Sequence, residues 1–307
     1  MRKIILIFSV LSTLAASAQQ QTTFTQYYSN DLLINPAISG SKNYNPLTFQ
    51  TRQQWLGFKN APLASNISYQ TAINNRSAMG GYLAFEKSSP SFHADLNLNY
   101  AYHVPLNYDR VNISFGIGGK LMYYNLDFDL EDLPPGYDPA YTASSFESVS
   151  YDASSGAYLY GRNFYFGFSA ANILQSSFNT PISGSLTPNA VSRNFYGLGG
   201  YRFYMMNNDW QFEPSFLVRK QEYQDMLLSL NARIFYMEDT WAGLTYKTDG
   251  NLGFAFGFAS NDTHFSYSYD HTLRGDMQQY NFGTHEIGIS FRIHAFVTQR
   301  HIGFWEY

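Results

Sequence analysis

The chain has 307 residues and no cysteine, with 23 acidic and 19 basic residues and a formal net charge of -4. This mild negative charge argues against a nucleic-acid partner, which requires a basic patch. Only 14% of the residues are charged and 18% are aromatic, whereas an average soluble domain has about 25% charged residues. These charges are too few to cover a soluble surface, but a barrel wall in a membrane can present apolar and aromatic side chains to lipid.

Residues 1–18 have the pattern of an export signal. Arg2 and Lys3 precede an apolar stretch that ends at Leu14, and Ala16-Ser17-Ala18 is a small-x-small cleavage site. We therefore predict a mature chain that begins at Gln19. The alternative, a membrane anchor, is disfavoured because a spanning helix needs roughly 20 apolar residues. No later apolar run reaches that length and the mean hydropathy is -0.29, which excludes a helical membrane protein.

Residues 19–44 contain Pro, Gly and Asn rather than a strand pattern, and we predict a separate N-terminal periplasmic or plug segment. From about residue 45 to residue 294 the chain alternates in segments of strand length, and residues 295–307 form a C-terminal tail. We interpret this tail as an unstructured periplasmic extension, with a partner-binding segment as the alternative. A barrel of about fourteen strands is too wide for its wall side chains to fill. Water, loops or residues 19–44 must therefore occupy the lumen.

The alternation has a period of two, which is typical of a strand with two different faces. Phe254, Phe256 and Phe258 share one face, while Gly253 and Ala255 lie on the other. We predict that such apolar faces meet lipid and that faces with Ser, Asn, Gly and occasional charges line the lumen. The predicted strands start near Asn45, Leu63, Ala78, Phe92, Arg110, Tyr151, Asn163, Arg193, Asp209, Met226, Thr240, Gly250, Thr263 and His285.

The faces of two predicted strands, near Tyr151 and Arg193, are ambiguous; in the second, Tyr196, Leu198 and Arg202 share a parity. The parity of the remaining strands places several charged and polar side chains in the lumen. They would form either an ion-selective channel or plugged gate, or internal salt bridges that hold the barrel closed. These residues are Gln50, Arg52, Asp95, Lys120, Glu213, Arg219, Arg233, Glu286 and Arg292.

The connections alternate between short turns and longer loops. Short turns rich in Asn, Asp and Gly suit tight hairpins, and the longest loops are residues 125–150, 173–192 and 272–283. In outer-membrane barrels the short turns are periplasmic, which predicts that both mature termini lie in the periplasm. A soluble β-sandwich or propeller also alternates, but its solvent face should carry many charges.

Three candidate chemical sites are weak. His285-Glu286 lacks the second His of a metalloprotease motif, and strand neighbours point to opposite faces. The acidic residues Asp127, Asp129, Glu131 and Asp132 do not have EF-hand spacing, so a solvated loop is the preferred interpretation over calcium binding. No nucleophile elbow accompanies the many serines. We predict no enzymatic activity, catalytic residue, metal or cofactor.

Several motifs resemble those of the PorP/SprF family, outer-membrane proteins associated with the type IX secretion system of Bacteroidota. The resemblance covers about residues 21–293. Its motifs are Phe24-Thr25-Gln26-Tyr27-Tyr28 with Asn30, Ile34-Asn35-Pro36-Ala37 with Gly40, Arg52-Gln53-Gln54-Trp55-Leu56-Gly57-Phe58 with Ala61-Pro62, Tyr267-Ser268-Tyr269-Asp270 and Gly283-Thr284-His285-Glu286-Ile287. Two departures are Ile38, where the family usually has an aromatic residue, and the length of the C-terminal tail.

The resemblance implies a role in protein secretion or surface attachment. Expected partners are the type IX translocon, periplasmic ring or lipoprotein components, and a secreted surface protein such as a gliding adhesin with a C-terminal sorting domain. A passive porin or uptake channel is the alternative. Motif residues with a possible structural or partner-contact role are Asn30, Asn35, Pro36, Gly40, Arg52, Gln54, Trp55, Gly57, Asp270, Gly283, His285 and Glu286. Asn35-Pro36 is equally a simple turn initiator.

Overall fold

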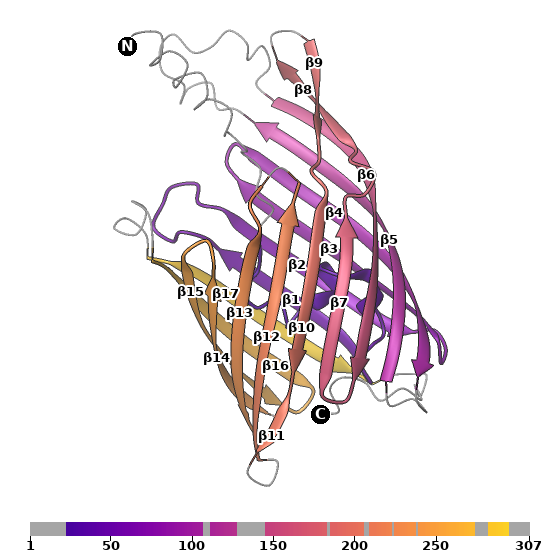
Figure 1. Cartoon of the computed structure of the whole chain (residues 1–307). Coiled ribbons are helices and arrows are strands. Elements are labelled where there is room, and N and C mark those ends of the chain that lie inside the picture. Colours follow the sequence, from indigo (N-terminus) through magenta and orange to yellow (C-terminus); the bar gives the residue numbers. More distant parts are fainter. Residues whose placement is uncertain are drawn as a thin grey trace, which may run out of the picture.

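A computed structural model describes residues 23–106, 111–127, 145–182, 185–205, 209–222, 224–237, 239–273 and 282–294. Tilted antiparallel strands form the closed wall of a barrel (Figure 1). Its strands are β1 (Asn45–Gln53), β2 (Leu63–Ala72), β3 (Ser77–Ser88), β4 (Ser91–Leu106), β5 (Val111–Asp127), β6 (Ser145–Gly161), β7 (Phe164–Ala171), β10 (Asn194–Tyr201), β11 (Phe203–Met205), β12 (Trp210–Gln221), β13 (Leu227–Tyr236), β14 (Thr240–Lys247), β15 (Asn251–Ser260), β16 (Thr263–Thr272) and β17 (Thr284–Ile293).

Two strand pairings complete the ring of the wall. The first and last strands pair from Asn45 opposite Ile293 to Gln53 opposite His285, and β10 pairs with β12. Only Arg202 separates β10 from β11, and both pair with β12, so together they form one wall segment. The fifteen strands of the sheet thus make fourteen wall segments, which confirms the predicted barrel.

Most strands begin within a residue of the predicted position. The main difference is β6, which begins at Ser145 rather than near Tyr151. Part of the predicted loop at residues 173–192 also forms a separate hairpin of β8 (Ser177–Ile182) and β9 (Ser185–Ala190). The sequence pattern missed both because their residues mix polar and apolar side chains without a clean alternation. The C-terminal tail, the signal and most of the loop at 125–150 lie outside the described residues.

The two wall faces follow the predicted parity. Phe254 is 49% exposed on the outer face, whereas Ala255 is 5% exposed on the inner face. The inner face is less uniformly polar than predicted, because Tyr196 and Leu198 are buried inside the barrel. They resolve the ambiguity of that strand and join an apolar cluster, which includes Tyr27, Tyr28, Ala37, Ile38, Tyr158, Tyr160, Tyr165 and Leu217.

Residues 23–44, here called the inner segment, lie inside the wall; their ribbon is indigo in Figure 1. The segment contains two short 3-10 helices, η2 (Asp31–Leu33) and η3 (Pro36–Ile38). No helix of the described chain is long and apolar enough to cross a membrane. The burial of the inner segment comes from side chains of many wall strands that contact it along its length.

The inner segment runs through the barrel from one end to the other. Thr23 Oγ1 accepts a hydrogen bond of 2.6 Å from Arg219, close to the end of β12 that leads into the 222–226 connection. Asn45, where β1 begins, lies beside Ile293 at the end of the short turns. Thr23 and Asn45 therefore lie at opposite ends of the barrel, whereas the predicted periplasmic termini lie outside the described residues. The lengths of the turns indicate which strand ends lie at the same end of the barrel. They do not indicate the path of a segment inside the barrel.

Candidate functional site

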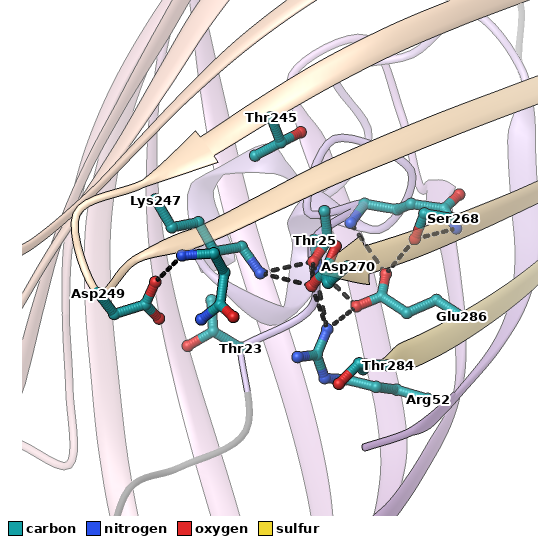
Figure 2. A network of polar contacts seen from close by, with 12 residues as sticks. Thr23, Thr25, Arg52, Thr245, Lys247, Asp249, Ser268, Asp270, Thr284 and Glu286 are labelled. Atoms are coloured by element: carbon teal, nitrogen blue, oxygen red, sulfur yellow. Dashed lines mark hydrogen bonds and ion pairs between the residues drawn. The ribbon is translucent and has the colours of Figure 1, made fainter. Parts of the chain in front are cut away.

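Four charged side chains hold the start of the inner segment. Each faces inward at the end of the barrel where β1 ends and β17 begins, and Figure 2 shows them converging on one threonine. Period-2 parity turns these four side chains inward. Barrel closure then brings β1, β14, β16 and β17 around one point. We call this group the Thr25 network; it consists of Thr25, Arg52, Lys247, Asp270 and Glu286.

Glu286 binds the backbone of the inner segment. Its two carboxylate oxygens accept hydrogen bonds from the Thr25 N–H at 2.7 Å and the Gln26 N–H at 3.0 Å. Ser268 donates to the same carboxylate at 3.2 Å and accepts from the Gln26 side chain at 3.1 Å. A carboxylate that accepts two successive amides fixes both the position and the direction of the chain that it binds.

The Thr25 side chain joins the remaining charges. Its hydroxyl donates to Asp270 and accepts from Arg52 and Lys247. Arg52 Nη1 lies 3.1 Å from the Asp270 carboxylate and also pairs with Glu286, and Lys247 Nζ lies 3.0 Å from Asp270. Two cations and two anions, all at most 7% exposed, balance one another. Removing one partner from such a buried set costs about 3–5 kcal/mol because a charge is left without compensation.

A second charged group holds the next residues. The carboxylate of Glu213, which is fully buried, pairs with Arg202 at 2.9 Å and also with Arg233. The Arg233 guanidinium lies 3.7 Å from the centroid of the Tyr28 ring, and the Tyr27 hydroxyl lies 3.1 Å from Ser215 Oγ. The guanidinium is thus stabilised both by a carboxylate and by the negative face of an aromatic ring.

The two asparagines of the opening motif hold the middle of the inner segment. Asn30 exchanges side-chain hydrogen bonds with Asn66 at 2.8 Å and Ser68 at 2.9 Å on β2. Asn35 caps η3 by accepting the Ala37 N–H at 2.9 Å, and it donates to the carbonyl of Ala157 at 3.0 Å. Asn35-Pro36 is therefore a turn initiator, and the same side chain also binds the wall.

Two wall glycines allow the turn at η3 to approach the wall closely. A Cβ atom at Gly116 would lie 2.3 Å from the Ala37 nitrogen, and one at Gly156 would lie 2.1 Å from Asn35 Oδ1. Ser114 donates to the Ala37 carbonyl at 2.6 Å beside them. Larger side chains at these two positions would displace the inner segment.

The end of the inner segment is bound near the short turns. Gly40 N–H donates to Gln70 at 2.8 Å. His103 Nε2 donates to the Ser39 carbonyl at 2.8 Å, so its Nδ1 accepts from the Tyr160 hydroxyl at 2.9 Å. This tautomer follows because a carbonyl oxygen can only accept.

The remaining motif residues join two connections outside the lumen. Leu56 N–H donates to the Gly283 carbonyl, and Phe282 N–H donates to the Leu56 carbonyl, both at 2.9 Å. Gly57 and Gly283 have φ angles of 104° and 85°, which disfavour residues with a Cβ atom. Trp55 N–H approaches Thr284 at 3.4 Å. Gln54 binds the Pro62 carbonyl through its N–H at 2.9 Å, within the same connection.

His285 and Glu286 point to opposite faces, as predicted. Glu286 enters the Thr25 network, whereas His285 donates to the Phe282 carbonyl at 3.2 Å and accepts from the Tyr267 hydroxyl at 2.7 Å. Among the described residues, no three His, Cys, Asp or Glu side chains are placed to hold a metal ion. Of the proposed acidic cluster, only Asp127 lies in the described chain.

The structure brings together three predicted motif residues, Arg52, Asp270 and Glu286, in one site. The predicted inward residues pair internally in three places, namely Arg52–Glu286, Arg233–Glu213 and Lys120–Asp95. Sequence reasoning missed Lys247 and left the face of Arg202 open. The parity of β14 was a usable signal for Lys247, because Thr245 and Lys247 share the inner face.

The fold is similar to that of outer-membrane channels. The toluene transporter TbuX of Ralstonia pickettii is 10% identical, with a TM-score of 0.54 over 87% of this chain and 94% of that one. The monoaromatic hydrocarbon channel CymD is 12% identical, with a TM-score of 0.52 over 87% of this chain and 93% of that one. At such identities the likeness shows the fold alone. No curated protein sequence matches the chain.

The family comparison covers nearly the whole chain. The family model of the type IX secretion system membrane protein PorP/SprF matches residues 16–291, which include the inner segment, the Thr25 network and nearly the entire wall. Together with the fourteen-segment barrel, this match makes the protein an outer-membrane component. The chain belongs to the PorP/SprF family of type IX secretion system membrane proteins.

Proposed function

We propose that this protein is a non-enzymatic component of type IX secretion that works by binding proteins, with the inner segment as a plug in its lumen. Its partners would be translocon subunits, periplasmic ring or lipoprotein components, or a secreted surface protein such as a gliding adhesin with a C-terminal sorting domain. The role would be export of that protein or its attachment to the cell surface.

The main support is the occupied lumen. The inner segment is bound at one end by Glu286 and Asp270, in its middle by Asn66, and near its other end by His103. Solute passage along this path would require breaking several buried hydrogen bonds and ion pairs at once. The inward charges pair with one another and with the inner segment, which favours the salt-bridge interpretation over an ion-selective channel.

Deletion of the gene tests the proposed function. We expect loss of surface display of one or a few exported proteins, measured by surface proteolysis and mass spectrometry, with unchanged uptake of a small hydrophilic antibiotic. Complementation with the wild-type chain serves as the control. Normal display of every exported protein in the deletion strain would contradict the proposal.

The alternative function is that of a passive porin, and the barrel architecture is compatible with it. Purified full-length protein in a planar lipid bilayer should show no steady conductance if the inner segment closes the lumen. A variant that lacks residues 23–44 provides the positive control for an open barrel, provided that it inserts. Steady open conductance of the wild-type protein would favour the porin.

A further inference from the structure

Amide side chains of β1 and β2 are among the groups of the wall that bind the inner segment. Asn66 of β2 bonds Asn30, Gln70 of β2 bonds the Gly40 N–H, and Gln50 of β1 donates to the Gln26 carbonyl at 3.3 Å. Residues two apart on a strand lie roughly 6.6–6.8 Å apart on one face. An extended chain has the same repeat, so rows of inward amides suit the binding of polypeptide.

A second set of inward amides on another side does not bind the inner segment. Asn97 and Asn99 are two apart on β4, and Asn172 follows β7; each is 3% exposed. Within the described chain, no protein group donates to the side-chain carbonyl oxygens of these three residues, or accepts from the Asn99 amide. Buried amide groups are normally hydrogen-bonded, so these groups are suited to a polar partner.

These amides border two adjoining spaces, here together called the vestibule. Asn172 borders a cavity of about 250 Å³, and Asn97 and Asn99 border an adjoining hollow of about 20 Å³. Leu33, Lys120 and Asn172 line both spaces, so the two spaces adjoin. A single water molecule needs roughly 10–15 Å³ of such volume. The larger space is therefore big enough for several side-chain groups, whereas the hollow beside Asn97 and Asn99 has room for about one small polar group.

The vestibule lies toward the end of the barrel with the longer connections. It is bordered by the ends of β3 and β4 and by Phe178 of the β8–β9 hairpin. Its apolar surface includes Phe24, Leu33, Met122 and Phe178, and its formal charges are those of Glu86, Asp95 and Lys120. Lys120 lies 3.7 Å from Asp95, so the three groups sum to one negative charge. This composition favours a neutral or cationic ligand with one apolar side chain.

We propose that the vestibule binds an extended peptide segment of a protein partner, with an apolar side chain against Phe24 and Met122. Polar groups of the peptide exchange hydrogen bonds with Asn172 and, in the adjoining hollow, with Asn97 and Asn99, as the Asn30 side chain does with Asn66 and the Gly40 N–H does with Gln70. This inference rests on the proposed function, because it names the site at which a protein partner is held.

The test uses the full-length protein in nanodiscs and a display library of randomised eight-residue peptides, with empty nanodiscs as counter-selection. The most enriched peptide is then synthesised with a fluorophore and its Kd is measured by anisotropy. Ala84→Trp fills the vestibule from β3, and Leu83→Trp is the matched control on the lipid-facing side of the same strand. Asn97→Leu with Asn99→Leu removes the amides without adding bulk.

We expect an enriched peptide that is neutral or cationic and has an apolar residue. Its Kd should rise at least tenfold in Ala84→Trp and in the double variant, and stay unchanged in Leu83→Trp. Failure to enrich any peptide, or equal affinity for Ala84→Trp, would overturn the proposal. Surface display separates the two hypotheses: normal display by Ala84→Trp in a deletion strain that otherwise loses display overturns the peptide site alone. Normal display without any copy overturns the proposed function instead.

Discussion

Strands β2 and β4 line the same lumen with the same kind of side chain, but they meet different surroundings. Asn66 and Gln70 of β2 bind the inner segment, whereas Asn97 and Asn99 of β4 border the vestibule. The difference lies in what the inner segment presents to each strand: polar groups of Asn30 and Gly40 meet β2, whereas apolar residues such as Leu33 and Ile34 border the hollow beside Asn97 and Asn99. Local sequence makes both strands alike, and the tertiary position of one short segment gives them different roles.

The largest expected difference in stability is between removal of a carboxylate from the Thr25 network and removal of a carboxylate from the vestibule. Glu286→Ala removes the acceptor of the Thr25 and Gln26 amides and leaves Arg52 partly unpaired, so it should lower the free energy of unfolding by about 3–5 kcal/mol. Glu86→Ala in the vestibule wall should change it by less than about 0.5 kcal/mol. Guanidinium titration of the folded barrel in lipid vesicles, followed by tryptophan fluorescence, measures both. Equal effects would contradict the special role of the Thr25 network.

A smaller effect is expected where the inner segment touches the wall most closely. Gly116→Ala puts a methyl group against the Ala37 backbone and should cost about 1–3 kcal/mol through overpacking. Gly119→Ala on the same strand meets nothing within 4 Å and should leave stability unchanged. The same titration compares the two variants. An unchanged Gly116→Ala variant would mean that the inner segment is not held against β5.

The smallest effect concerns single amides. Asn35→Ala removes the cap of η3 and should cost about 0.5–2 kcal/mol. Asn99→Ala removes amide atoms that have no partner in the described chain, so the free energy of unfolding should stay the same or rise slightly. Melting of the two variants side by side, followed by circular dichroism, makes this comparison. A larger loss for Asn99→Ala would show that its amide already stabilises the unliganded barrel.

The sequence by itself determined the wall of this protein. Alternation at Phe254, Phe256 and Phe258 predicted a strand and its outer face, because the period of two is a local property of an extended backbone. The same rule turned Arg52 and Glu286 inward, and the motifs around them indicated the family. Alternation failed where the inner face is itself apolar, as at Tyr196 and Leu198.

Only the tertiary structure decided what occupies the lumen and how. Asp270 and Glu286 come from the last two strands, yet they meet Thr25 near the N-terminus. Their convergence depends on strand register and barrel closure, which no local pattern encodes. The direction in which the inner segment crosses the barrel has the same origin, because it is set by contacts with distant parts of the chain, such as Thr23 with Arg219 and Ser39 with His103. Local periodicity places side chains on a face, but only long-range packing determines which of those faces meet.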